Sequence, residues 1–195
     1  MSKKLVLVAA PPACGKNYVS EMICKSLGSV SYLDKDDLSP LLRSAFAVSG
    51  ECVDMDGEFY LQNLRSSEYD TLLNLAFSAL RFAEVVLVNA PFLKEVRDAD
   101  YMRRLKARAS EAGAELILIW VNAPLEVCYE RMRSRNSDRD LSKLENWAEY
   151  VKKTDYSIPS GLETENAVDR LIVFENGNEK SAELSLYTVM NILGE

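Results

Sequence analysis

Short, continuous apolar runs alternate along the chain with segments in which apolar side chains recur every three or four residues. Five such runs occur, at residues 5–8, 30–33, 85–88, 116–121 and 171–174. Runs of this kind are typical of strands that are buried on both faces of a parallel sheet. The stretches between them, such as 19–27, 72–83 and 182–193, have helical spacing. The pattern predicts a three-layer α/β domain with right-handed crossovers between parallel strands.

The composition is that of a globular protein that spans no membrane. The chain has 195 residues, 48% of them hydrophobic and 27% charged, which indicates one globular domain over residues 1–195. Its net charge of -7 disfavours nucleic-acid binding, because an acidic surface repels phosphate backbones. No apolar window is long enough to span a membrane, and four scattered cysteines indicate reduced thiols in a cytoplasmic protein. Monomer and homodimer both stay open.

The chain contains no histidine. This excludes imidazole acid–base catalysis, serine–histidine triads and histidine-ligated metal sites. Proton transfer must therefore fall to Asp, Glu, Lys, Tyr or Cys.

A candidate phosphate loop, Ala-Pro-Pro-Ala-Cys-Gly-Lys-Asn at residues 10–17, joins the first strand to the first helix. In such a loop, backbone N–H groups and a lysine face the anion. It resembles the Walker A loop of nucleotide-dependent kinases, usually GPPGSGKST, although Ala10 and Ala13 replace glycines. Asn17 stands where a Ser or Thr hydroxyl ligates magnesium, and its amide oxygen is our candidate Mg²⁺ ligand. The alternative is a chance Gly-Lys pair at a helix start. The predicted nucleotide-binding residues here are Ala13, Cys14, Gly15, Lys16, Asn17 and Tyr18.

Carboxylates follow the second strand at Asp34, Asp36 and Asp37. A hydroxyl that accepts a phosphoryl group needs a carboxylate to orient it and take its proton. The segment resembles the aspartate motif of polynucleotide kinase, zeta-toxin and chloramphenicol phosphotransferase relatives. That resemblance implies Asp36 as the base, with Asp34 contacting substrate or a magnesium-bound water. Alternatively, Asp36 or Asp37 caps the following helix.

The third strand ends at Asn89, where these relatives usually carry an acidic residue. An amide does not neutralise a cation, so we interpret Asn89 as a group that binds substrate. Arg97 matches an arginine that commonly follows this strand, and Arg43 and Arg65 would suit an anionic acceptor. Each arginine has the alternative of being a solvated surface charge.

Four arginines occur within nine residues after the fourth strand. Three of them, Arg131, Arg135 and Arg139, share a helix face if one helix continues through them. The segment at about 129–146 resembles the lid of nucleoside-monophosphate kinases, which implies that these arginines stabilise the transferred charge. The alternative is a solvated helix face. The fifth strand leads to Asn176 and Gly177, which either line the adenine or form a simple turn.

The order of these motifs resembles that of P-loop small-molecule kinases along most of the chain. The resemblance implies a P-loop nucleoside triphosphate hydrolase fold, with a parallel sheet in the order 2-3-1-4-5 and an arginine-rich lid. It further implies ATP and Mg²⁺ as cofactors and transfer of the γ-phosphoryl group to a hydroxyl of a small molecule. Two alternatives remain: a non-catalytic nucleotide-binding module that has lost its magnesium ligands, and a nucleic-acid 5′-end kinase.

Overall fold

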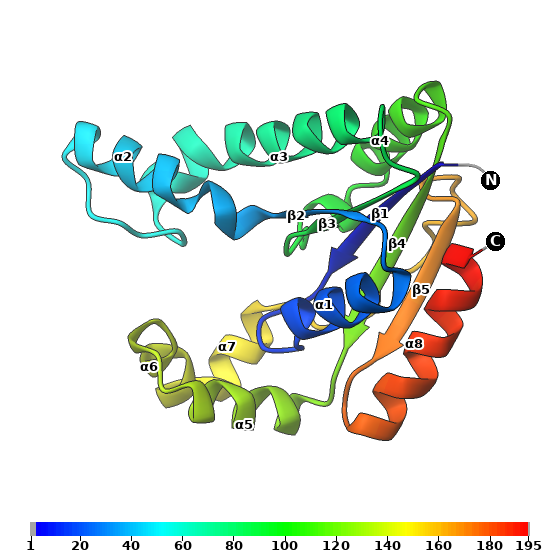
Figure 1. Ribbon diagram of the computed structural model, residues 1–195. Coiled ribbons are helices and arrows are strands. Elements are labelled where there is room, and N and C mark those ends of the chain that lie inside the picture. The colour runs from blue at the N-terminus through cyan, green and yellow to red at the C-terminus, as the bar shows by residue number, and fades with distance from the viewer. Residues whose placement is uncertain (1–2, 195) are drawn as a thin grey trace.

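The computed structural model describes residues 3–194, apart from the side chains of residues 138 and 139. Its centre is a five-stranded sheet in which every pair of neighbours is parallel, in the order β2-β3-β1-β4-β5 (Figure 1). The strands are β1 (Lys3–Ala9), β2 (Ser31–Asp34), β3 (Val85–Asn89), β4 (Ala114–Asn122) and β5 (Arg170–Glu175). All five predicted strands and their predicted order are confirmed.

Helices connect the strands and cover both faces of the sheet (Figure 1). They are α1 (Lys16–Leu27), α2 (Ser39–Ser49), α3 (Arg65–Ala79), α4 (Ala99–Glu111), α5 (Leu125–Arg135), α6 (Asp138–Glu145), α7 (Trp147–Lys153) and α8 (Glu179–Gly194). Short 3₁₀ turns occur at Lys35–Leu38 and Glu95–Arg97, and a π-helical turn at Tyr60–Leu64 leads into α3.

The alternation of side chains along β1 divides the core into two clusters. Leu5 and Leu7 pack on one face of the sheet with apolar residues of α3 and α4. Val6 and Val8 pack on the other face with residues of α1 and α8. Because both faces are covered, the central strands consist almost entirely of buried apolar residues, which explains their continuous apolar runs.

Strand register brings the polar strand ends together. In the parallel pairing, Asn89 of β3 lies opposite Val8 of β1 on one side and opposite Asp34 of β2 on the other. The loop that follows β1 therefore opens beside both polar residues. This is the carboxyl-terminal edge of the sheet, where ligands bind in open parallel α/β folds.

The segment at about 129–146, which the sequence predicts as a lid, is divided between helices rather than formed by one continuous helix. Helix α5 ends at Arg135, where Asn136 takes a left-handed conformation with φ 46°, and α6 starts at Asp138. Arg139 therefore lies on a different helix from Arg131 and Arg135, and its side chain lies outside the described residues. Between residues 3 and 194, no helix combines the length and apolar character that crossing a membrane requires.

Candidate active site

The loop between β1 and α1 takes an anion-binding shape. Ala13 and Gly15 both have positive φ, 64° and 91°, and Gly15 is the left-handed residue that precedes the first turn of α1. The N–H groups of that first turn have no intrahelical acceptors. Position 13 carries an alanine in the left-handed conformation. Position 15 has no room for a side chain, because a Cβ added at Gly15 would lie 2.3 Å from the Asn176 side-chain nitrogen.

Two polar side chains, from α5 and from the loop after β5, bind the backbone of this phosphate loop. Arg131 of α5 donates to the Cys14 carbonyl at 3.1 Å and to the Asn176 carbonyl at 2.8 Å. The Asn176 amide, which is buried, donates to the Cys14 carbonyl at 2.7 Å. Both residues therefore fix the loop backbone, a role that the sequence does not predict for either.

Lys16 is the first residue of α1, and its side chain reaches the polar end of β3. Its Nζ donates to Asn89 Oδ1 at 2.7 Å and to Asn17 Oδ1 at 3.1 Å. Burial lowers the pKa of Lys16 from 10.5 to about 8, although the nearby carboxylates of Asp34 and Asp36 favour the charged form. The ammonium thus lies in a partly desolvated position where an anionic phosphate would stabilise it.

Asn89 is fully buried at the centre of a hydrogen-bond network. Its Oδ1 accepts from Lys16 and from Ser20, the latter at 3.1 Å. Its Nδ2 lies 2.6 Å from Asp34 Oδ2 and 3.0 Å from the Tyr32 hydroxyl. Both ends of the amide are bonded to the protein, so this arrangement favours a positioning role for Asn89 over direct substrate contact.

Asp34, the last residue of β2, and Asp36, in the turn that follows, have different environments. Asp34 accepts from the Tyr32 hydroxyl at 2.6 Å and from the Asp36 N–H at 2.9 Å. Burial opposes ionisation of Asp34, but these hydrogen bonds and that from Asn89 outweigh it and lower its pKa. Asp34 also caps the turn Lys35–Leu38. The alternative that Asp36 or Asp37 caps the following helix is wrong, because α2 begins after Leu38 with no side-chain cap. The Asp36 side chain is 69% exposed, with Lys35 Nζ 3.9 Å away.

The structure describes the side chains of four other arginines that the sequence predicts for the site: Arg43, Arg65, Arg97 and Arg135. Three of them bind protein carboxylates: Arg65 pairs with Glu95 at 2.7 Å, Arg97 with Asp155 at 2.9 Å, and Arg135 with Asp140 at 2.6 Å. Arg97 also donates to the backbone of residues 155 and 157, so it secures the segment that follows α7. Arg43 is exposed on α2.

The other predicted nucleotide-binding residues lie around the loop. Asn17 and Tyr18 are exposed in the first turn of α1, and Gly177 lies against Pro124, the residue before α5. The structure thus brings Ala13 to Tyr18, Asn176 and Gly177 together. Arg43 lies on α2 and Arg65 on α3, where Arg65 is bound to Glu95. That these two arginines bind an anionic acceptor stays a prediction.

Oxygen donors suited to a magnesium ion are present beside the loop. Asn17 Oδ1 and Asp34 Oδ2 lie 3.0 Å and 2.6 Å from the same nitrogen, Nδ2 of Asn89. Magnesium usually takes one or two protein oxygens and completes its shell with phosphates and water. The two residues fit that limited role. In the described part of the chain, no group of three or more Cys, Asp or Glu side chains forms a fuller metal site.

Sequence reasoning missed several residues of this region. Tyr32 and Ser20 complete the network around Asn89, and Lys35 donates to Glu68 at 3.0 Å, a buried carboxylate that also accepts from the Tyr60 hydroxyl. A signal existed for Tyr32, because residues two apart on a strand share a face and Tyr32 precedes Asp34 by two. The pairs with Glu68 and Glu95 join segments about thirty residues apart and have no local signal. Arg135 and Asp140 are five residues apart, but their pairing depends on the break between α5 and α6.

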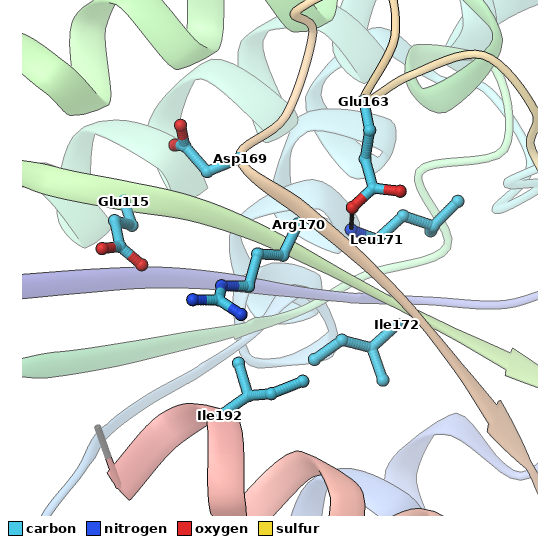
Figure 2. A pocket seen from close by; sticks show the side chains of 7 residues that line it. All are labelled: Glu115, Glu163, Asp169, Arg170, Leu171, Ile172 and Ile192. Atoms are coloured by element: carbon cyan, nitrogen blue, oxygen red, sulfur yellow. Dashed lines mark hydrogen bonds between the residues drawn. The ribbon is translucent and has the colours of Figure 1, made fainter.

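Two cavities lie away from Lys16 and Asp36, since neither residue lines them. Figure 2 shows one of about 480 Å³ at the amino-terminal end of β5, opposite the phosphate loop. Its carboxylates support the fold: Glu163 accepts from the Leu171 N–H, and Asp169 accepts from the Leu116 N–H. A second groove, of about 470 Å³, runs along α5 and includes Arg131.

Known proteins share the fold described above. The family model described as AAA domain (AAA_33) matches residues 5–154. A gluconokinase from Sinorhizobium meliloti 1021 is 18% identical with a TM-score of 0.54, covering 99% of this chain and 96% of its own. The APS kinase CysC of Mycobacterium tuberculosis is 18% identical with a TM-score of 0.54, covering 100% of this chain and 99% of its own. A fungal RNA kinase is 12% identical with a TM-score of 0.60, covering 99% and 86%. The sequence matches no curated protein.

At these identities the structural neighbours establish the fold, and the family model, which spans most of the chain, establishes membership. The chain belongs to the AAA domain family AAA_33 and has the fold of the P-loop kinases.

Proposed function

We propose that this protein is an ATP-dependent kinase that transfers the γ-phosphoryl group to a hydroxyl of a small molecule. The observation that carries the proposal is the position of Lys16, half-buried at the phosphate loop with Asp34 and Asp36 close enough to affect its pKa. A phosphate-binding cation and a carboxylate at one site are the minimum that phosphoryl transfer to a hydroxyl needs. The gluconokinase and APS kinase neighbours support this reaction class by their names.

The exposed carboxylate of Asp36 is the base in this proposal, as the sequence predicts. Asp34 is a weaker candidate because three donors already stabilise its charge. The acceptor oxygen bonds to the γ-phosphorus as its proton passes to Asp36. The bond to the β–γ bridging oxygen breaks, and ADP leaves.

Magnesium, held by Asn17 and Asp34, would neutralise charge on the phosphate oxygens. Arg131 positions the loop through its backbone contacts. Arg135 and Arg139 are the lid arginines proposed to stabilise the transferred group, for which Arg135 must leave Asp140. The loop around Asn176 and Gly177 borders the proposed adenine site.

A second candidate, a nucleotide-binding module without catalysis, is favoured by one specific observation. Asn89 stands where relatives carry an acid, and its amide lies between the two oxygens that would hold magnesium. Such a module would bind nucleotide equally well with and without the metal. A nucleic-acid 5′-end kinase is disfavoured by the net charge of -7.

Calorimetric titration with ATP, with and without magnesium, tests both candidates. We expect micromolar binding, about 8 kcal/mol, that strengthens with magnesium and is lost in Lys16→Ala. Lys25→Ala, a surface lysine on the same helix paired with Glu21, is the matched control and should bind normally. Asp36→Asn should bind ATP normally and lose transfer to any acceptor that releases ADP from the wild type.

Metal-independent binding without ADP release for a panel of hydroxyl compounds would favour the non-catalytic module. Absence of nucleotide binding by the wild type would contradict both candidates.

A further inference from the structure

A pair of buried cysteines joins the phosphate loop to the helix that leads into the lid. Cys14 lies in the loop and Cys128 in α5, 114 positions later, and their Sγ atoms are 3.6 Å apart. Both side chains are almost completely buried, at 1% and 0% exposure. The other two cysteines are separate: Cys24 is half-buried on α1 and Cys52 is exposed.

We propose that Cys14 and Cys128 are a redox-modification site, in which a hydroperoxide converts the two thiols into a disulfide that switches off nucleotide binding. Neither thiol takes part in the phosphoryl transfer described above. The distance between the two sulfurs is the observation that carries the proposal. A disulfide bond is about 2.05 Å long, so the sulfurs need to approach each other by about 1.5 Å.

The surroundings of the pair favour Cys128 as the sulfur that reacts first. The hydrogen bond between the two thiols lowers the pKa of Cys128 more than burial raises it, and the charge of Arg131 also lowers it. The same hydrogen bond, followed by burial, raises the pKa of Cys14. The thiolate is the nucleophile in cysteine oxidation, and a neighbouring thiol resolves the product.

The chemistry balances with hydrogen peroxide as the oxidant. The Cys128 thiolate attacks one peroxide oxygen, the O–O bond breaks, and the departing hydroxide takes up a proton to give water and a sulfenic acid. The Cys14 sulfur then attacks the Cys128 sulfur, the S–O bond breaks, and a second water leaves with the Cys14 proton. Two thiols and one peroxide thus yield one disulfide and two waters.

Closure of the disulfide would distort the phosphate loop because Cys14 has little freedom to move alone. It lies between Ala13 and Gly15, which both have positive φ, and its carbonyl is held by Arg131 and Asn176. Drawing its sulfur toward α5 displaces the N–H groups of the next two residues from the phosphate. We expect nucleotide affinity to fall roughly tenfold or more, which equals the loss of one hydrogen bond to a charged group.

The experiment uses the full chain with Cys24→Ser and Cys52→Ser, so that only the proposed pair remains. The protein is treated with hydrogen peroxide, quenched with catalase, denatured and alkylated. We expect both thiols to resist alkylation, the intact mass to fall by two hydrogens, and dithiothreitol to reverse both changes. The matched control adds Cys128→Ala, which should form no intramolecular disulfide. Peptide mapping of the oxidised wild type gives a readout that depends on no variant.

The proposal is overturned if both thiols remain alkylatable at a peroxide dose that fully oxidises the exposed Cys52 of the wild type. The switch is overturned if the disulfide forms and ATP affinity stays within twofold of the reduced value. The effect on affinity rests on the proposed function, but disulfide formation does not. Failure of the reduced protein to bind ATP would therefore refute the function, while mass and alkylation would still decide the site.

Discussion

Replacement of Gly15 by alanine tests whether Asn176 holds the phosphate loop as described. Gly15 has φ 91°, and an added Cβ would lie 2.3 Å from Nδ2 of Asn176. The left-handed backbone alone costs a side chain about 1 to 2 kcal/mol. The Asn176 amide must also move by about 1 Å to reach ordinary van der Waals contact, and it then leaves the Cys14 carbonyl, a buried bond worth roughly 2 kcal/mol. The sum is about 3 to 4 kcal/mol.

Gly113→Ala is the matched control, because Gly113 has φ 71° and its Cβ would meet nothing within 4 Å. In a domain of this size the two costs correspond to a fall in melting temperature of about 10 °C for Gly15→Ala and about 4 °C for Gly113→Ala. Thermal unfolding followed by circular dichroism measures both. Placing Gly15→Ala in an Asn176→Ala background removes the clash, so its added cost should drop to that of Gly113→Ala.

Equal melting temperatures for the two single alanine variants would refute the reasoning. So would a cost of Gly15→Ala that persists undiminished in the Asn176→Ala background.

Two further predictions concern charged groups. Because the pKa of Lys16 is lower in the folded than in the unfolded protein, the unfolded chain binds more protons between pH 8 and 10.5. The free energy of unfolding in EDTA should therefore rise by about 2 kcal/mol from pH 7 to pH 9.5 because of Lys16. The variant Lys16→Met should lack this contribution. The prediction is contradicted if the free energy of unfolding depends on pH identically in both proteins. Arg65→Ala leaves the nearly buried Glu95 carboxylate unpaired, so chemical denaturation should show a loss of about 3 kcal/mol, reduced in Arg65→Ala/Glu95→Ala. The surface change Lys25→Ala should have little effect, and a loss for Arg65→Ala no larger than for Lys25→Ala would contradict the buried pair.

The sheet could be predicted from the sequence because burial on both faces leaves a direct signature, the continuous apolar run. The central strands β1, β3 and β4 carry it, whereas the edge strands β2 and β5 are less buried. The motif order supplied the arrangement of all five. Helix ends were harder to predict. The helix breaks between Arg135 and Asp138 because Asn136 takes a left-handed conformation. Asparagine occurs within helices as well as at their ends, so the residue type alone does not predict the break.

In the candidate site, the places of the functional residues could be predicted from the sequence better than their hydrogen-bond and ion-pair partners. The loop, Lys16 and the two aspartates follow from strand ends, since parallel strands deliver their carboxyl ends to one edge. The partners of the arginines did not follow. Arg131 contacts a loop more than a hundred residues earlier, and Arg65 pairs with a glutamate on another segment. Such pairings depend on tertiary packing, which no local pattern encodes.

The hairpin formed by α2, the π-helical turn Tyr60–Leu64 and the start of α3 extends away from the sheet (Figure 1). It has a small core of its own, made by Leu42, Phe46 and Tyr60. This core is separate from the two clusters on the sheet faces. A unit with few buried apolar contacts opens at a lower free energy than the body it joins. Its backbone amides should thus exchange with solvent through local opening, while those of the central strands exchange only on global unfolding. Substitutions in this hairpin can therefore accumulate with little effect on the sheet that carries the phosphate loop.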